Sequence, residues 1–238
     1  MAALSGTLLN AATVLVGGLL GIALGDRLGE HVRERVVFGV GLFILTLGMR
    51  FAIESSNPLY LLGSILFGGI AGALLGIDRR LNAVGDALQR RFARGGSGGT
   101  VSEAFVTATI VFCVGPLTFL GAIRNGLSGD ASLLVIKSVL DGFTAIALAA
   151  SLGWGVLLTI VVVVVYQGGL ALAAASLAGL LSDLQLREMN AVGGLLLLGV
   201  GLKLLSIRDV KVADYLPAIF VAPLLVALVN TVKETLGL

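Results

Sequence analysis

Residues 130–150 read DASLLVIKSVLDGFTAIALAA. This stretch has the length at which an α-helix crosses the hydrocarbon core of a bilayer, about 20 residues. The charged residues in its interior are Lys137 and Asp141, which lie four residues apart and so share one helix face. Ionisable groups inside a membrane are costly and usually face a bundle interior. The pair therefore indicates either a functional site or a self-neutralising link between helices.

The rest of the chain repeats this apolar pattern. Apolar residues make up 57% of the sequence and charged residues 13%, about half the charged share of a soluble domain. The mean hydropathy is +1.05. We therefore predict an all-α, polytopic transmembrane bundle of about eight spans, or seven if the fourth is a re-entrant segment. The predicted spans cover residues 6–25, 36–53, 58–77, 103–122, 132–150, 154–180, 190–207 and 214–232.

One segment divides this single membrane domain. Residues 1–77 form a three-span part, and residues 103–238 form a five-span part. Between them, residues 78–102 combine a predicted amphipathic helix, with arginines opposite an apolar face, and a glycine-rich linker. The helix is either a solvated tether or a lipid-sensing element on the cytoplasmic leaflet.

Two helices suggest internal symmetry. Residues 41–50 read GLFILTLGMR and residues 194–203 read GLLLLGVGLK. Each apolar run ends with a glycine two positions before a cation, and each precedes another apolar helix. This pattern favours an inverted repeat of spans 1–3 and 6–8, an arrangement common in transporters.

Arginine and lysine gather in alternate loops. Residues 27–35, 79–94 and 203–211 are rich in them, whereas Arg50, Arg124 and Arg187 stand singly in the other loops. The positive-inside rule then places the rich loops in the cytoplasm and both termini outside. The predicted location is a bacterial inner membrane.

The polar residues of the spans are the candidates for an ion or substrate site. Asp141 is the candidate for binding a proton or Na⁺, and Lys137 is its candidate counter-ion. Proline removes a backbone donor, so Gly115 and Pro116 predict a helix break that frees carbonyl groups. A lone asparagine in a membrane helix bonds a neighbouring helix more often than a ligand. The full candidate set is Asp141, Lys137, Thr144, Asn10, Gly115, Pro116, Thr118 and Asn190.

Two further groups of residues, a polar segment and two series of glycines, each allow a structural and a functional interpretation. A polar, glycine-rich segment between the fourth and fifth spans predicts an outer turn or a gate, formed by Asn125, Gly126, Ser128, Gly129 and Asp130. Glycines at four-residue steps let helices approach closely, or let them slide. Such steps occur at Gly17, Gly21 and Gly25, and again at Gly68, Gly72 and Gly76.

Several chemistries find no support in the sequence. His31 is the only histidine and lies in a charged loop, so no histidine-based metal site or catalytic triad can be assembled. No phosphate-binding GxxxxGK[ST] loop is present. We therefore expect no enzyme activity, no cofactor, no metal and no nucleic-acid partner. The expected partners are the lipid bilayer and a small solute or ion of unknown identity, with a homo-oligomer left open.

Particular runs of sequence resemble a known family. They include residues 121–130 (GAIRNGLSGD), 137–141 (KSVLD), 143–145 (FTA), 191–198 (AVGGLLLL) and 216–218 (LPA), together with 9–11 (LNA) and 17–18 (GG). In these the chain resembles the YqgA/YdfK-type bacterial inner-membrane family, catalogued as domain of unknown function 554. The resemblance covers nearly the full chain. It implies a membrane protein, sometimes labelled a transporter, and implies no particular substrate.

The leading hypothesis from the sequence is a secondary transporter or ion-coupled permease. Its site would lie where spans four and five meet spans one and seven. A passive channel is the second hypothesis. The third is a membrane scaffold or sensor that uses the arginine-rich helix.

Overall fold

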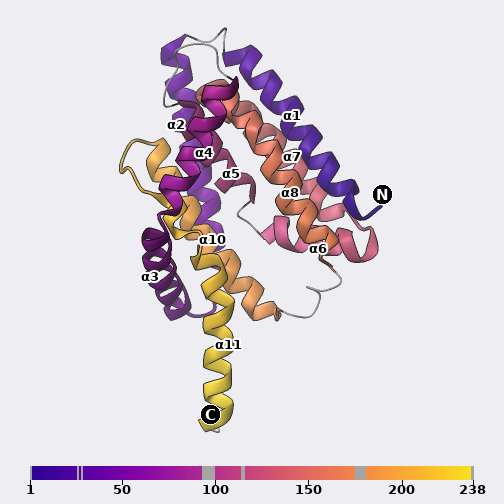
Figure 1. Ribbon diagram of the computed structural model, residues 1–238, viewed down its shortest axis with the longest axis vertical. Coiled ribbons are helices and arrows are strands. Elements are labelled where there is room, and N and C mark those ends of the chain that lie inside the picture. Colours follow the sequence, from indigo (N-terminus) through magenta and orange to yellow (C-terminus); the bar gives the residue numbers. More distant parts are fainter. Residues whose placement is uncertain are drawn as a thin grey trace.

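The computed structural model is helical throughout its described part, residues 2–25, 27, 29–92, 100–113, 116–174 and 181–236 (Figure 1). The elements are η1 Ala2–Leu4, α1 Ser5–Gly25, α2 Glu30–Ala52, α3 Pro58–Leu75, α4 Ile77–Phe92, α5 Thr100–Cys113, α6 Pro116–Ser128, α7 Ser132–Leu152, η2 Trp154–Leu158, α8 Thr159–Leu172, α10 Asp183–Leu204, η3 Val212–Tyr215 and α11 Ala218–Leu236. The prediction of an all-α fold is confirmed.

Six helical segments are long and apolar enough to cross a membrane. The other two predicted spans fall on α10, which begins with polar turns, and on the short helices α5 and α6. The bundle is therefore a transmembrane one, while length and composition alone support six of the eight predicted spans. The six are Ser5–Gly25, Glu34–Ala52, Pro58–Leu75, Ser132–Leu152, Trp154–Leu172 and Val212–Lys233.

Local capping moves one predicted boundary by seven residues. The seventh span was predicted to begin at residue 190, but α10 begins at Asp183. The Ser182 hydroxyl accepts a hydrogen bond from the Gln185 backbone N–H, and the Gln185 side chain accepts one from the Ser182 N–H. This capping box satisfies two backbone donors and starts the helix in a polar segment, before the apolar run begins.

The fourth predicted span is interrupted between α5 and α6, as Gly115 and Pro116 suggest. We call the end of the bundle where α1 begins the proximal end, and the end where α1 stops the distal end. Val101, at the start of α5, packs against Gly155 at the distal end. Gly126, near the end of α6, packs against Ala171 at the proximal end. The two short helices therefore traverse the bundle once, whereas a re-entrant hairpin would return to its starting end.

Helices α1 and α7 run parallel and closely packed along the right of Figure 1. A Cβ atom at Gly17 would lie 2.3 Å from the carbonyl oxygen of Gly142, and one at Gly21 would lie 2.4 Å from that of Ile146. At Gly25 the corresponding oxygen belongs to Ala150, at 2.6 Å. The first glycine series therefore allows backbone-to-backbone contact along most of α1.

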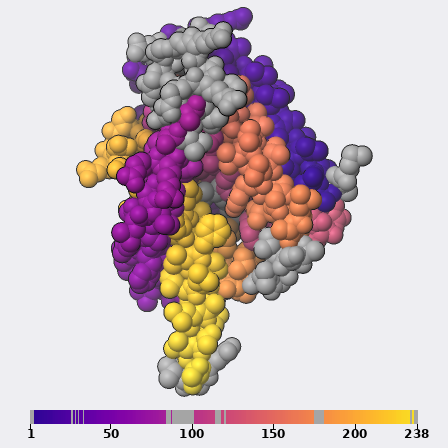
Figure 2. Space-filling model, in the orientation of Figure 1, coloured from indigo at the N-terminus to yellow at the C-terminus, as the bar shows by residue number. Residues whose placement is uncertain are grey.

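Two antiparallel pairs build the other side of the molecule, and their contacts are reciprocal. Gly48 of α2 lies against the carbonyl oxygen of Gly194 of α10, and Gly194 lies against that of Gly48. Seven residues farther along α10, Gly201 lies against the carbonyl oxygen of Gly41. Helix α3 pairs with α11 in the same antiparallel way, and Figure 2 shows the two side by side in purple and yellow. Such pairs are what an inverted repeat requires, and the repeat itself stays a prediction.

The second glycine series serves two purposes. Gly68 packs against Ala218, and Gly72 against the carbonyl oxygen of Asp214. Gly76 instead ends α3 in the left-handed conformation, with φ of 60°, which glycine adopts without a steric penalty. It thereby separates α3 from α4, the predicted amphipathic helix, on which Arg79 and Arg80 are exposed. The glycine-rich linker at residues 95–99 lies outside the described residues.

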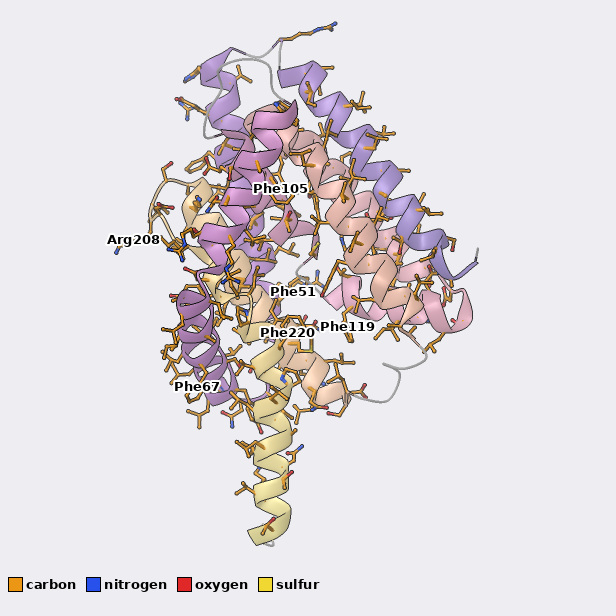
Figure 3. All side chains as sticks on the ribbon, in the orientation of Figure 1. Phe51, Phe67, Phe105, Phe119, Arg208 and Phe220 are labelled. Atoms are coloured by element: carbon orange, nitrogen blue, oxygen red, sulfur yellow. The ribbon has the colours of Figure 1, made fainter. Side chains whose placement is uncertain are left out.

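Large apolar side chains cover the outside of the bundle. On α3 they include Leu59, Phe67 and Leu74, which are 69%, 60% and 83% exposed. In Figure 3, Phe67 points away from the helices, while Arg208 projects from the loop that follows α10. An apolar exterior of this extent is expected of a surface in contact with lipid.

The α1–α7 contact leads to a stability prediction. We expect Gly17→Ala to lower the free energy of unfolding by about 1–3 kcal/mol, because the new methyl group would overlap the Gly142 carbonyl. Gly39→Ala is the matched control, since a Cβ at Gly39 meets no atom within 4 Å. Unfolding of the purified protein in detergent, followed by circular dichroism, measures both. Equal effects of the two substitutions would contradict the close contact.

Candidate functional site

An ion pair lies on the inner face of α7. Lys137 and Asp141 are only 5% and 7% exposed, and the Lys137 ammonium contacts the Asp141 carboxylate through Oδ2. The (i, i+4) spacing brings the two side chains together on one helix face, as the sequence predicts. A buried pair of opposite charges is neutral overall, which is the state that a low-dielectric interior favours.

Two amides from other helices extend this pair. Asn10 of α1 is fully buried, and its Nδ2 donates to Asp141 Oδ2 at 3.0 Å and to Gln167 Oε1 of α8 at 3.1 Å. Gln167 is 1% exposed. We call Asn10, Lys137, Asp141 and Gln167 the polar cluster. It joins α1, α7 and α8 in the interior of the bundle.

The carboxylate dictates how both amides are oriented. A carboxylate only accepts hydrogen bonds, so Asn10 must present its N–H group to Asp141. The second N–H of Asn10 then requires the oxygen of Gln167. This leaves Asn10 Oδ1 and Gln167 Nε2 buried without a partner, and the nearby helix turn adds the unpartnered Thr7 hydroxyl. An unsatisfied buried polar group costs about 1–3 kcal/mol, so three of them on adjoining turns indicate a site with a use.

Helices α5 and α6, on the two sides of the break, both pack against α7, the helix that carries the ion pair. Just past the break, the Thr118 hydroxyl of α6 donates to the carbonyl oxygen of Phe112 at 3.2 Å. Thr118 thus satisfies one of the carbonyl groups that the interruption frees. Residues 114–115 lie outside the described residues, and the Pro116 backbone begins α6.

Two hollows flank the site. A cavity of about 210 Å³ lies between α5, α8 and the start of α11, with Thr109, Cys113, Tyr166 and Phe220 among its lining residues. The Thr109 hydroxyl is also buried without a partner. On the other side, an open groove of about 370 Å³ between α1 and α7 is lined by apolar side chains and by Ser138 and Gly142. The first cavity lies against α8, and its lining residue Tyr166 directly precedes Gln167 of the polar cluster.

Other candidate residues lie elsewhere. The Thr144 hydroxyl donates to the carbonyl oxygen of Leu140, and the side chain lines a groove against α2. Asn190 is half-buried on α10, which contributes nothing to the polar cluster.

The predicted outer turn is shorter than expected. Asn125, Gly126 and Ser128 were expected in the turn, but all three belong to α6. Asn125 is fully buried, and its Oδ1 accepts from the Gly6 N–H at 3.1 Å. Tertiary contacts therefore extend the helix through a sequence that reads locally as a turn. Only Gly129, Asp130 and Ala131 connect α6 to α7.

Asp130 caps the start of α7. Its carboxylate accepts from the Ser132 hydroxyl at 2.6 Å and the Ser132 backbone N–H at 2.9 Å, and it pairs with Arg124 at 2.9 Å. These hydrogen bonds, followed by the Arg124 charge, hold the pKa of Asp130 below its ordinary value. The residue has a structural role that explains its position without a gate.

Sequence reasoning missed two buried groups. Gln167 is the only amide in the run TIVVVVVYQGG, and a search for single amides within apolar spans would have found it. Glu188 is fully buried, and its carboxylate accepts from the Ser55 hydroxyl, the Ser56 hydroxyl and the Ser56 N–H at 2.6–2.7 Å. It ties the α2–α3 turn to α10, and no pattern in the sequence links these distant residues.

Two carboxylates, those of Asp78 and Asp214, lie close together where α4 meets η3. The Asp78 backbone N–H donates to Asp214 Oδ1 at 2.8 Å. Partial burial, and then the Asp214 charge, raise the pKa of Asp78. Among the described residues no three histidine, cysteine or acidic side chains gather closely enough to hold a metal ion.

The polar cluster predicts an asymmetry between single and double substitutions. We expect Lys137→Met to destabilise the protein by about 3–5 kcal/mol at neutral pH, because it strands a buried carboxylate. Lys137→Met combined with Asp141→Leu should recover most of that loss, since no charge then remains. Unfolding in detergent measures both. A double variant that is less stable than Lys137→Met would contradict the direct pairing.

Comparison with known proteins agrees with this architecture. The chain is 33% identical over 220 residues to a protein of Escherichia coli K12 called uncharacterized protein YqgA, covering 91% of this chain and 94% of the relative. It is 26% identical over 229 residues to the uncharacterized membrane protein YdfK of Bacillus subtilis 168, covering 94% and 96%. No solved structure matches the chain. A family model described as protein of unknown function (DUF554) matches residues 5–227, and the chain therefore belongs to the DUF554 family.

Proposed function

We propose that this membrane protein is an ion-coupled secondary transporter, or permease, for a small solute or ion. The observation that carries the proposal is the polar cluster. It is an ion pair inside a transmembrane bundle, hydrogen-bonded to Asn10 of α1, which in turn bonds Gln167 of α8. The divided helix α5–α6 packs against the same helix α7. Intramembrane ionisable groups commonly mark ion and substrate pathways.

Each residue of the site has a role in this proposal. Asp141 exchanges the coupling ion, and Lys137 serves as its counter-ion when that ion is absent. A change in the charge of Asp141 changes its hydrogen bond with Asn10. Because Asn10 also donates to Gln167, the change alters the orientation of Gln167 as well. The division of the fourth predicted span into α5 and α6, with the Thr118 hydroxyl bonded to the Phe112 carbonyl, resembles the discontinuous helices that transporters place at their binding sites.

The packing of the remaining helices supports the same class of function. Transporters often consist of inverted repeats that move against each other around a central site. Antiparallel pairs such as α2 with α10 and α3 with α11 supply the contacts along which two such halves would meet. Contacts between glycines and backbone leave few side chains to interlock, which favours sliding or rocking.

We also propose the orientation that the loop charges indicate, in a bacterial inner membrane, with both termini outside. In a background with Cys113→Ala, Arg80→Cys should react with a membrane-impermeant maleimide only after the cytoplasmic face is opened. Ser128→Cys should react in intact cells, because Arg80 and Ser128 are exposed at opposite ends of the bundle. Labelling of both residues from the same face would contradict this topology.

Measurement on proteoliposomes tests transport directly. We expect jumps in H⁺, Na⁺ or small organic solutes to give a saturable signal in the wild type: a current on a solid-supported membrane where transport moves net charge, or a change in the internal pH of the vesicles where proton-coupled transport is electroneutral. Asp141→Asn should abolish this signal while the protein still folds. Asp209→Asn is the matched control, because that aspartate lies in an exposed loop.

The outcomes separate the rival functions. Equal signals in wild type and Asp141→Asn would remove Asp141 from the mechanism. A current that does not saturate and does not respond to a second gradient would indicate a channel. A scaffold or lipid sensor would give neither signal, and its activity would depend on the α4 arginines.

A further inference from the structure

We infer that the polar cluster binds a small monocarboxylate that carries a hydrogen-bond donor beside its carboxylate, such as a 2-hydroxy acid, together with one proton. This inference deepens the proposed function and rests on it. It names the class of substrate and the stoichiometry of coupling at the same site.

The buried N–H donors of the polar cluster that have no protein partner favour a bound anion. The carboxylate of Asp141 fixes Asn10, and Asn10 fixes Gln167, so Gln167 Nε2 is presented as a buried N–H donor without a partner. Lys137 has three N–H donors, and Asp141 is the partner that it contacts. A ligand carboxylate would accept from Lys137 and Gln167 and would replace Asp141 as the counter-ion of the ammonium.

The buried acceptor without a partner, Asn10 Oδ1, requires a hydrogen-bond donor on the ligand. Asn10 Oδ1 belongs to the same two-amide chain as Gln167 Nε2 and is also buried without a partner. A hydroxyl on the carbon next to the ligand carboxylate would donate to it. The Thr7 hydroxyl can either donate or accept. The cavity of about 210 Å³ against α5 and α8, whose lining includes Tyr166, the residue before Gln167, has room for a short apolar body but not for a large one.

Charge balance explains why a proton accompanies the anion. The Lys137–Asp141 pair is neutral when no ligand is bound. An anion bound to Lys137 would leave Asp141 as an unpaired buried carboxylate, which is strongly disfavoured in a low-dielectric interior. One proton taken up by Asp141 restores neutrality. Binding is therefore coupled to uptake of one proton per anion, which is the stoichiometry of proton–anion symport.

The surroundings of Asp141 contain no competing charge among the described residues. Helix α1 contributes Asn10, α8 contributes Gln167, and α5 contributes the Cys113 thiol. In the groove between α2 and α7, the α2 residues are Val36, Gly39, Val40 and Phe43, which carry no charge. A cation bound at Asp141 would lie next to the Lys137 ammonium or would have to displace its proton. The fixed positive charge thus favours an anion.

Glycolate and acetate are the matched probes, because they differ only by the hydroxyl group. The purified full-length protein in detergent is titrated with each in weak buffer at pH 7, with binding followed by calorimetry and proton uptake by a pH-sensitive dye. We expect one proton to be taken up per bound glycolate. Acetate should bind about tenfold more weakly, as expected for the loss of one hydrogen bond.

Two variants assign the proton and the anion to separate residues. Asp141→Asn should still bind glycolate, because Lys137 remains, but without proton uptake. Lys137→Gln combined with Asp141→Asn keeps the site neutral and should bind no glycolate. Should the single variant fail to fold, the proton stoichiometry of the wild type still decides the question.

The possible results separate this inference from the proposed function. Absence of glycolate binding, binding without proton uptake in the wild type, or proton release on adding Na⁺ would each overturn the inference. Currents driven by another solute, with no glycolate binding, would retain the transporter and reject the substrate class. Proton-linked glycolate binding without uptake of labelled glycolate into proteoliposomes would retain the site and reject transport, because symport of one proton with one monoanion carries no net charge and gives no current.

Discussion

The parallel contact between α1 and α7 is the constraint on which the site depends. Gly17 and Gly21 bring the two backbones together, and this closeness places Asn10 within hydrogen-bond reach of Asp141. A larger residue at either glycine would separate the helices. The amide of Asn10 would then leave the carboxylate, and the ion pair would lose its hydrogen bond to α1. Helix packing and the chemistry of the polar cluster are thus one structural problem.

The membrane makes that problem sharper than it would be in water. Backbone and side-chain polar groups in the bilayer core find partners only within the protein. Most groups in this bundle do: Thr118 satisfies Phe112 at the helix break, and Ser55 and Ser56 satisfy the buried Glu188. Five buried side-chain atoms of the described residues have no partner, and three of them, on Asn10, Gln167 and Thr7, lie on α1 and α8 around one ion pair; the other two are the Ser64 and Thr109 hydroxyls.

The two sides of the bundle use glycine differently. Along α1 and α7, backbone meets backbone between parallel helices around the polar cluster. Along α2 and α10, the contacts are antiparallel and reciprocal and surround no charge, since Gly41, Gly48, Gly194 and Gly201 meet backbone and leucine side chains. The α1–α7 interface contains the polar cluster, and the α2–α10 interface is lined by apolar residues. This combination suits a protein in which one part moves against another around a fixed site.

The sequence alone determined the class of the fold and the centre of the site. Apolar runs of bilayer length require membrane helices, and four-residue spacing requires Lys137 and Asp141 to meet, because both follow from the geometry of a single helix. Only the tertiary structure decided that Asn10 and Gln167 complete the cluster, that Asn125 is buried within α6, and that Thr144 and Asn190 lie elsewhere. Those outcomes depend on which faces of distant helices come together, and residues more than a hundred positions apart leave no local pattern that records it.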